Sequence, residues 1–188
     1  DNGYMHTSGN IPFDLNIGSS TFGKYFENDF LNLKTKAELS DLPFLSPYIT
    51  ELDSAEGNYE IMLNVKGPIG NLTRDGYILI QDGILHTQLL NDPIKFINGE
   101  AQLINNKLRI KNLSADLNIE NVENVSRKNP NTKIVGEINL NKFFNPRYNL
   151  KLESKNASFK LLFLDIYGET NLDLSIFGRD TVYISGKI

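Results

Sequence analysis

The amino-acid sequence predicts an all-β protein, built as an elongated, open antiparallel sheet with one apolar face. Three observations lead to this fold class: apolar residues recur at every second position, turn-forming residues separate the runs, and helical periodicity is almost absent. With 188 residues, of which 40% are apolar, the chain is long enough to form one domain with a core of its own.

The first half of the chain contains a series of runs that alternate between apolar and polar residues. Side chains two positions apart point to the same face of a strand, so each run predicts a strand with one buried face. In chain order the apolar members are Phe13, Leu15 and Ile17; Leu31 and Leu33, then Ala37 and Leu39; Ile61, Leu63 and Val65; Ile78 and Ile80; Ala101 and Leu103; Leu108 and Ile110; and Leu113, Ala115 and Leu117.

The second half continues the same pattern to the end of the sequence. Together the two halves predict about a dozen strands, a number that rests on the alternation alone. The apolar members here are Ile134 or Val135, leading to Ile138 and Leu140; Tyr148, Leu150 and Leu152; Phe159, Leu161 and Phe163; Leu172, Leu174 and Ile176; and Val182 and Ile184.

Turn-forming residues fall between these runs. Gly, Asn, Asp and Pro favour tight turns because they tolerate or fix the backbone angles that turns require. Their close spacing predicts antiparallel connections, most of them hairpins. These segments are 74–76, 81–83, 91–93, 97–100, 105–106, 129–131 and 177–180.

Only one segment has a helical pattern, and it predicts a short helix near 42–50. Two prolines, Pro43 and Pro47, limit it to one or two turns because proline lacks an amide donor and disrupts a helix interior. Such a helix is too small to cover a dozen strands. The apolar residues that would share its face are Leu42, Leu45, Tyr48, Ile49 and Leu52.

The asparagine pair at 105–106 fixes the register of one hairpin. A two-residue turn there places Leu103 opposite Leu108 and Ala101 opposite Ile110, so that both strands turn their apolar side chains to the same face. The polar residues between them then face water.

The strand that follows this turn contains a break in the alternation. Leu113, Ala115 and Leu117 have the opposite parity to Ile110, so one extra residue is needed to keep all of them on one face. We therefore predict a β-bulge near 111–112.

Charge and cysteine content exclude some classes of partner and site. The formal net charge is −4, from 19 basic and 23 acidic residues that are mixed along the chain, so no basic block is available for nucleic acid. The absence of cysteine excludes disulfides and thiolate metal sites, and it is compatible with either a reducing or an oxidising compartment. The sequence shows no membrane-spanning apolar run and no signal peptide at its start.

No constellation of residues predicts catalysis. The two histidines, His6 and His86, lie far apart in the sequence and lack the spacing of a metal site, and we interpret both as surface residues. The chain contains no nucleophile elbow, phosphate-binding loop or dinucleotide-binding fingerprint. We expect no enzymatic activity, no cofactor and no metal.

The apolar face itself is the strongest functional feature of the sequence, and it has two interpretations. One is the core of a closed β-sandwich, in which two sheets pack about 10 Å apart. The other is a groove with walls that never meet fully, which leaves room for acyl chains. Burial of apolar surface favours some cover in both cases, but it does not decide between protein and lipid.

The order of the features resembles a known family. Residues 37–188 are similar to the C-terminal region of TamB, the translocation and assembly module component, within the AsmA-like superfamily. The matching parts are a short helical segment at 42–49, a Gly-led strand at 57–67, a second at 76–86, and a strand, glycine, hairpin and strand at 94–117. Residues 1–36 lie outside the resemblance.

The resemblance implies a β-taco, a long trough made of strands with an apolar interior and a polar exterior. It implies a single segment, 1–188, of a longer periplasmic protein that is anchored in the inner membrane. It also implies lipid transport in outer-membrane biogenesis: the trough would be a non-enzymatic segment that shields the acyl chains of phospholipids moving between the two membranes. An outer-membrane barrel protein of the TamA type is an implied partner.

The residues expected to contact acyl chains are the inward-facing members of the alternating runs. These lipid-groove residues are Ile61, Leu63, Val65, Ile78, Ile80, Ala101, Leu103, Leu108, Ile110, Leu113, Ala115, Leu117, Ile138, Leu140, Leu150, Leu152, Leu172, Leu174, Ile176, Val182 and Ile184.

Two other functions stay open at this point. The chain could be a scaffold or chaperone for outer-membrane protein assembly, in which open sheet edges pair with strands of a barrel partner by β-augmentation. It could also be a closed β-sandwich that binds glycan or protein. A dry, filled core without a continuous trough would favour the sandwich. Proline substitutions on an edge strand would impair the scaffold, whereas charges on the inward face would impair lipid transport.

Overall fold

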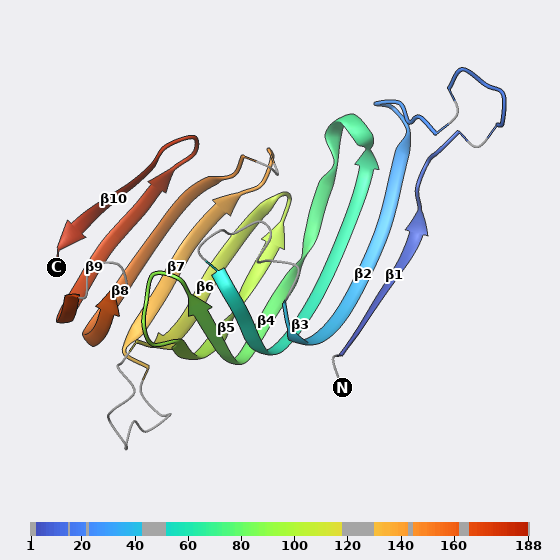
Figure 1. Cartoon of the computed structure of the whole chain (residues 1–188). Coiled ribbons are helices and arrows are strands. Elements are labelled where there is room, and N and C mark those ends of the chain that lie inside the picture. The colour runs from blue at the N-terminus through green and yellow to red at the C-terminus, as the bar shows by residue number, and fades with distance from the viewer. Residues whose placement is uncertain are drawn as a thin grey trace.

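In the computed structural model the chain forms one ten-stranded antiparallel sheet in which each strand pairs with its neighbours in sequence (Figure 1). The structure describes residues 3–14, 16–21, 23–42, 52–117, 130–142, 145–161 and 166–187. The strands are β1 (Tyr4–Asn10), β2 (Phe30–Asp41), β3 (Leu52–Pro68), β4 (Thr73–Thr87), β5 (Ile94–Ile104), β6 (Lys107–Asp116), β7 (Thr132–Asn139), β8 (Arg147–Leu161), β9 (Ile166–Gly178) and β10 (Val182–Lys187), with one 3₁₀ turn, η1 (Ile69–Asn71).

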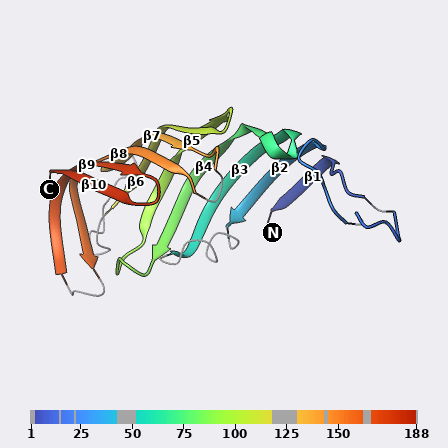
Figure 2. The ribbon, with the colours of Figure 1, turned by 90° about the horizontal axis from the view of Figure 1, so that it is seen from above.

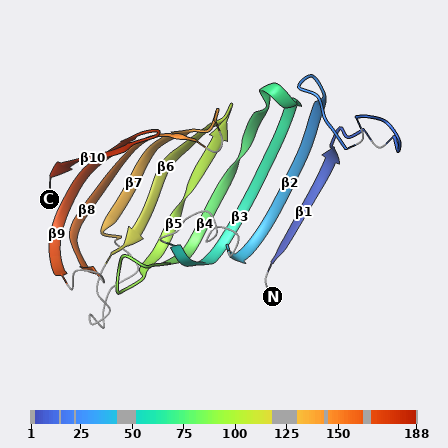
Figure 3. The ribbon, with the colours of Figure 1, turned by 45° about the horizontal axis from the view of Figure 1, so that its top comes forward.

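This architecture confirms the predicted fold class, an all-β protein with one open antiparallel sheet. The sheet order follows the chain order from β1 to β10, and the two edge strands lie at opposite ends of the sheet (Figures 1 and 3). The described residues form this one sheet, so a closed sandwich of two facing sheets is not the fold of this part of the chain.

The predicted hairpin at 105–106 is confirmed. Leu103 pairs with Leu108, and Ala101 pairs with Ile110. Both turn residues adopt positive φ angles, 49° at Asn105 and 65° at Asn106, as a type I′ turn requires. Asparagine tolerates this left-handed conformation better than most residues, and therefore this short sequence could fix the register.

The predicted bulge in β6 is confirmed at Lys111. Asn112 pairs with Glu100 while Ile110 pairs with Ala101, so Lys111 is the extra residue on β6. Because of it, the residues before and after the bulge turn their apolar side chains to the same face.

Similar irregularities occur in four other strands. The register shifts place them beside Gly57 in β3, at 82–83 in β4, beside Phe96 in β5 and beside Asn156 in β8. Asn156 and Phe96 both adopt a positive φ of 50°. Bulges bend strands and increase their twist, and the strands of this sheet are visibly bent (Figure 2).

The bend in β3 and β4 creates a small core. The bulge beside Gly57 separates Leu52 and Ala55 from Tyr59 along β3. All three residues are nevertheless buried in one cluster with Leu42. Residues on both sides of a bend can touch only on its inner side, so the strands fold toward the face that carries Tyr59. The short helix predicted near 42–50 falls on residues 43–51, which lie outside the described residues.

Backbone hydrogen bonds also join distant segments along the same margin of the sheet. The Ser158 amide donates to the Leu117 carbonyl at 3.0 Å, and the Asn91 amide donates to the Lys160 carbonyl at 2.9 Å. The last residues of β8, beyond its bulge, therefore reach the end of β6 and the β4–β5 connection.

The connection between β1 and β2 differs from the sequence prediction. The alternation of Phe13, Leu15 and Ile17 predicts a strand, but Phe13 and Ile17 lie in a loop, where their side chains are 51% and 89% exposed. Leu15 lies outside the described residues. Alternation alone cannot identify a strand when no neighbouring strand is available to pair with it.

Asp14 holds this loop together. Its carboxylate accepts hydrogen bonds from the Thr21 hydroxyl, from the Asn16 amide at 2.9 Å and from the Ser19 hydroxyl at 3.1 Å. Its backbone carbonyl accepts a hydrogen bond from the Gly23 amide at 2.7 Å. These donors, with Thr21 the largest contributor, lower the pKa of Asp14 below its ordinary value of 3.8.

We expect the loop to loosen only in strong acid. A lowered pKa in the folded state means that the ionised carboxylate stabilises the loop above pH 3.8, and that this contribution is lost as the pH falls through the lowered pKa. A carboxyl-carbon NMR titration should give a midpoint below 3.8 for Asp14. The variant Thr21→Val should move this midpoint upward, and a wild-type midpoint at or above 3.8 would contradict the assignment.

Candidate functional site

The register of the sheet assembles one continuous apolar face. Directly paired residues on neighbouring strands share a face, so the pairings can be followed across the sheet as rows. The first row is Thr7, Thr35, Leu63, Gly76, Leu103, Leu108, Ile138, Tyr148, Gly178 and Val182; the second is Met5, Ala37, Ile61, Ile78, Ala101, Ile110, Gly136, Leu150, Ile176 and Ile184; the third is Leu39, Tyr59, Ile80, Gly99, Leu113, Ile134, Leu152, Leu174 and Gly186.

Two shorter rows flank these three. Leu33 and Val65 continue the face beside the first row, and Val65 is paired in turn with Arg74. On the other side the row consists of Ala115, Thr132, Ser154 and Leu172. The Thr132 and Ser154 hydroxyls are 2.7 Å apart and hydrogen-bonded, so these buried polar groups satisfy each other. We call all five rows together the apolar face.

All lipid-groove residues predicted from the sequence that lie in strands belong to the apolar face. The other two predicted residues, Leu117 and Leu140, do not lie in strands, because each follows the last residue of its strand. The Leu140 amide donates to the Asn106 carbonyl at 2.7 Å, which ties the end of β7 to the β5–β6 turn.

The predicted lipid-groove residues omit several members of the face. Tyr59 was missed by the alternating pattern, whereas Tyr148 and Ile134, the latter as an alternative to Val135, belong to the pattern but not to the predicted lipid-groove residues; all three lie in the rows. Glycines in the rows hide the alternation. At Gly136 the φ angle is +140°, and an added Cβ would lie 2.3 Å from the Asn149 carbonyl oxygen, so this row position has to lack a side chain.

The apolar face has little cover. Among the described residues no large side chain is fully buried, and the apolar residues at the two edges are the most open, with Met5 69% and Ile184 66% exposed. A filled protein core would bury its largest side chains completely. The face therefore has the composition of a core but is covered only in part: Ala37, Tyr59 and Leu103 are buried, most other members are half-buried, and the edges are exposed.

The opposite face of the sheet is polar and carries ion pairs. Glu137 lies 3.5 Å from Lys107 and 3.3 Å from Arg109, and Lys151 lies 2.6 Å from Glu153. Glu153 and, after it, Asp173 raise the pKa of Lys151, so this amine stays charged. Exposed pairs of this kind contribute little stability, but they keep this face in water.

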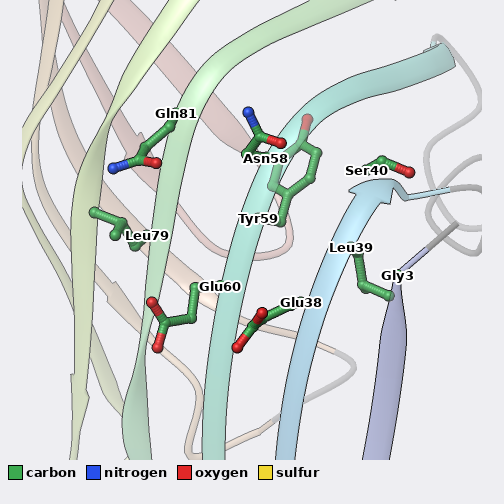
Figure 4. Close-up of a pocket in the computed structure, with 9 residues that line it drawn as sticks. All are labelled: Gly3, Glu38, Leu39, Ser40, Asn58, Tyr59, Glu60, Leu79 and Gln81. Atoms are coloured by element: carbon green, nitrogen blue, oxygen red, sulfur yellow. The ribbon is translucent and has the colours of Figure 1, made fainter. Parts of the chain in front are cut away.

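A polar hollow of about 360 Å³ lies on this side of β2, β3 and β4 (Figure 4). Glu38 and Glu60 are paired across β2 and β3, and each accepts a hydrogen bond from a tyrosine, Tyr4 at 2.7 Å and Tyr77 at 2.6 Å. The Tyr4 hydroxyl and then Lys36 lower the pKa of Glu38, which keeps this carboxylate ionised. Glu38 therefore suits a solvated surface better than proton donation.

A second hollow, of about 620 Å³, lies over β7 to β10. Phe177 and Tyr183 line it and stack with their ring centroids 5.7 Å apart, while Glu137, Arg147 and Asn149 supply polar groups. The sequence pattern gave no sign of this pair, because the alternation marks residues that face the other way.

No group of side chains in the described part of the chain could hold a metal ion. His86 lies 3.8 Å from the Glu56 carboxylate, and His6 is paired with Lys36 on the polar face. Within the same residues no helix is long and apolar enough to span a membrane.

Searches of family models, curated proteins and solved structures found no match for this chain. The resemblance to the TamB C-terminal region therefore stays a prediction that rests on the motifs of the sequence. The candidate site is defined by geometry: one apolar face, open to its surroundings, opposite a polar face.

Proposed function

We propose that this chain is a non-enzymatic lipid-transfer segment whose apolar face shields phospholipid acyl chains on their way between the inner and outer membranes. One observation carries the proposal: the second row of apolar and glycine residues runs from one sheet edge to the other, and within the described residues no large side chain of the face is fully buried. The resemblance to the TamB region supports the same function.

The physical driving force is the transfer of apolar surface out of water. Each Å² of apolar surface that acyl chains cover contributes about 25 cal/mol, and this contribution requires no specific site. Ten strands spaced about 4.8 Å apart extend the face over about 43 Å, which exceeds the hydrocarbon thickness of a bilayer, about 30 Å. A face of this length supports movement of a lipid along the row direction.

The location and the partner belong to the same proposal. A lipid path between two membranes requires a periplasmic position, and the resemblance adds an inner-membrane anchor in a longer parent protein. A barrel protein of the TamA type would receive the other end.

Site-specific photo-crosslinking tests the proposal. Crosslinkers at Leu103 and Ile110 on the apolar face should trap phospholipid in cells, whereas crosslinkers at Glu100 and Arg109 should not. The pairings Glu100 with Asn112 and Arg109 with Glu137 support the use of these two as matched controls on the polar face. Phospholipid trapped only at Glu100 and Arg109 would show that the faces have been assigned the wrong way round.

A second candidate function, a scaffold for outer-membrane protein assembly, is favoured by the edges of the sheet. Every residue of β1 and of β10 is exposed, and neither strand contains a proline or an internal bulge. Natural proteins usually protect edges with such features, and an unprotected edge can accept another strand.

Edge prolines separate this function from the first. Proline at whichever of Ile184 and Ser185 directs its amide away from β9 removes a free edge donor, so we expect reduced capture of a TamA-type barrel protein with unchanged phospholipid crosslinking at Ile110. The reverse result, lost lipid crosslinking with full barrel capture, would contradict the scaffold function.

A further inference from the structure

The β1–β2 connection forms a finger that projects beyond the edge of the sheet (Figures 1 and 2). It carries an unusual number of exposed apolar side chains for a loop. The five that we call the finger surface are Ile11 (53% exposed), Phe13 (51%), Ile17 (89%), Tyr25 (59%) and Phe26 (53%).

The finger needs few hydrogen bonds from outside. The Asp14 amide donates to the Lys24 carbonyl at 3.2 Å, and the Lys24 amide donates to the Thr21 carbonyl at 2.9 Å. The Ser19 amide donates to the Asn16 carbonyl at 3.0 Å, and the Thr21 amide donates to the Ser19 hydroxyl at 3.0 Å. With the Asp14 carboxylate as a common acceptor, the polar groups at the tip bond to one another and leave the apolar side chains outside.

The base of the finger is attached to the sheet. The Gly70 amide donates to the Glu27 carbonyl at 2.9 Å, the Ile69 amide donates to the Asp29 carbonyl at 3.0 Å, and the Asp29 carboxylate accepts from the Phe26 amide at 2.8 Å. Both amides from η1 therefore attach the base of the finger to the sheet.

The charge of the outer part of the finger, residues 11–26, is balanced, although Glu27 and Asp29 at its base are acidic. Residues 11–26 contain one acidic residue, Asp14, and one basic residue, Lys24, so that their formal charge is 1 − 1 = 0. This part of the finger therefore offers little charge for a partner that binds by electrostatic attraction. Polar groups that bond within the loop, an almost fully exposed isoleucine and exposed aromatic rings are instead properties of protein segments that lie at a membrane interface.

We propose that the finger surface inserts into the interfacial layer of a lipid bilayer, with Ile17 as the deepest side chain. The occupant is a lipid surface without a requirement for anionic headgroups, since the finger carries no basic cluster. This inference goes beyond transport along the apolar face and does not depend on it, because the two surfaces share no residue.

A single tryptophan can test this insertion, because the chain contains none. We expect the emission of the Ile17→Trp variant to shift to shorter wavelength on vesicles of pure phosphatidylcholine, and to be quenched by brominated acyl chains. The matched control is Ser185→Trp, at an exposed residue of the far edge strand β10 that pairs with Ser175 on the polar face, and its emission should change much less.

Vesicle flotation gives a second measurement. Ile17→Asp should lower the partition coefficient on phosphatidylcholine vesicles by about tenfold or more, because the deepest apolar side chain is replaced by a charge. Ser185→Asp, on the polar face of β10, should leave it nearly unchanged. Since Ile17 is 89% exposed, the substitution should not affect folding, which circular dichroism can verify.

Three results would overturn the inference. The first is unchanged Ile17→Trp emission on vesicles, which would leave a protein as the occupant of the finger surface. The second is binding that appears only when phosphatidylglycerol is added, since that would assign the attraction to charge. The third is loss of insertion in Ile176→Asp with the finger intact, which would attribute vesicle binding to the apolar face.

Discussion

Ile176→Asp should weaken phospholipid binding about 100-fold, because a carboxylate among acyl chains costs about 3 kcal/mol. Ile176 lies in the second row of the apolar face, between Leu150 and Ile184, so a lipid that moves along the row has to pass it. Titration with a phospholipid that carries a fluorescent acyl chain would measure the dissociation constant.

Ser175→Asp is the matched control for this prediction. Ser175 precedes Ile176, is exposed, and pairs with Lys151 on the polar face, where a new carboxylate finds a positive neighbour. We expect lipid binding within about twofold of wild type, an effect no larger than that of an ordinary surface substitution. Equal losses in both variants, with both proteins folded by circular dichroism, would contradict a lipid-bearing face.

Deletion of Lys111 should lower the free energy of unfolding by about 3 kcal/mol, because it removes the bulge that keeps β6 in phase. Without this residue, Leu113 and Ala115 turn toward the polar face, and polar neighbours replace them on the apolar one. Urea unfolding followed by circular dichroism would measure the loss.

Substitution of the same residue provides the control. The Lys111 side chain is exposed, so Lys111→Gln keeps the bulge and should change the free energy of unfolding by less than about 0.5 kcal/mol. A deletion variant as stable as Lys111→Gln would mean that the bulge is not needed for the register of β6.

Some features of the fold could be predicted from the local sequence alone. The asparagine turn and the change of parity at Lys111 are both visible in a short stretch of sequence, because a tight turn fixes the register and each side chain then has a determined face. The bulges beside Gly57 and Phe96 were not predicted, since the signal depends on which residue of the next strand each one opposes.

The finger is the clearest case in which local pattern gave the wrong structure. Phe13 and Ile17 alternate like strand residues, yet the Asp14 hydrogen bonds close the segment into a loop and leave both side chains exposed. Side-chain hydrogen bonds from Asp, Ser and Thr compete with sheet pairing, and the alternation of apolar residues does not include that competition.

The sequence by itself determined that the chain is all-β, which residues share the apolar face, and the register of the central hairpin. Alternation and turn chemistry are local, and a period of two assigns each side chain to a face as soon as the strand is identified. Only the tertiary structure decided where β3, β4 and β8 bend, and that within the described residues no second sheet packs on the apolar face. Those outcomes depend on contacts between residues far apart in the chain, such as the hydrogen bonds of Ser158 with Leu117 and of Asn91 with Lys160, and no local pattern encodes them.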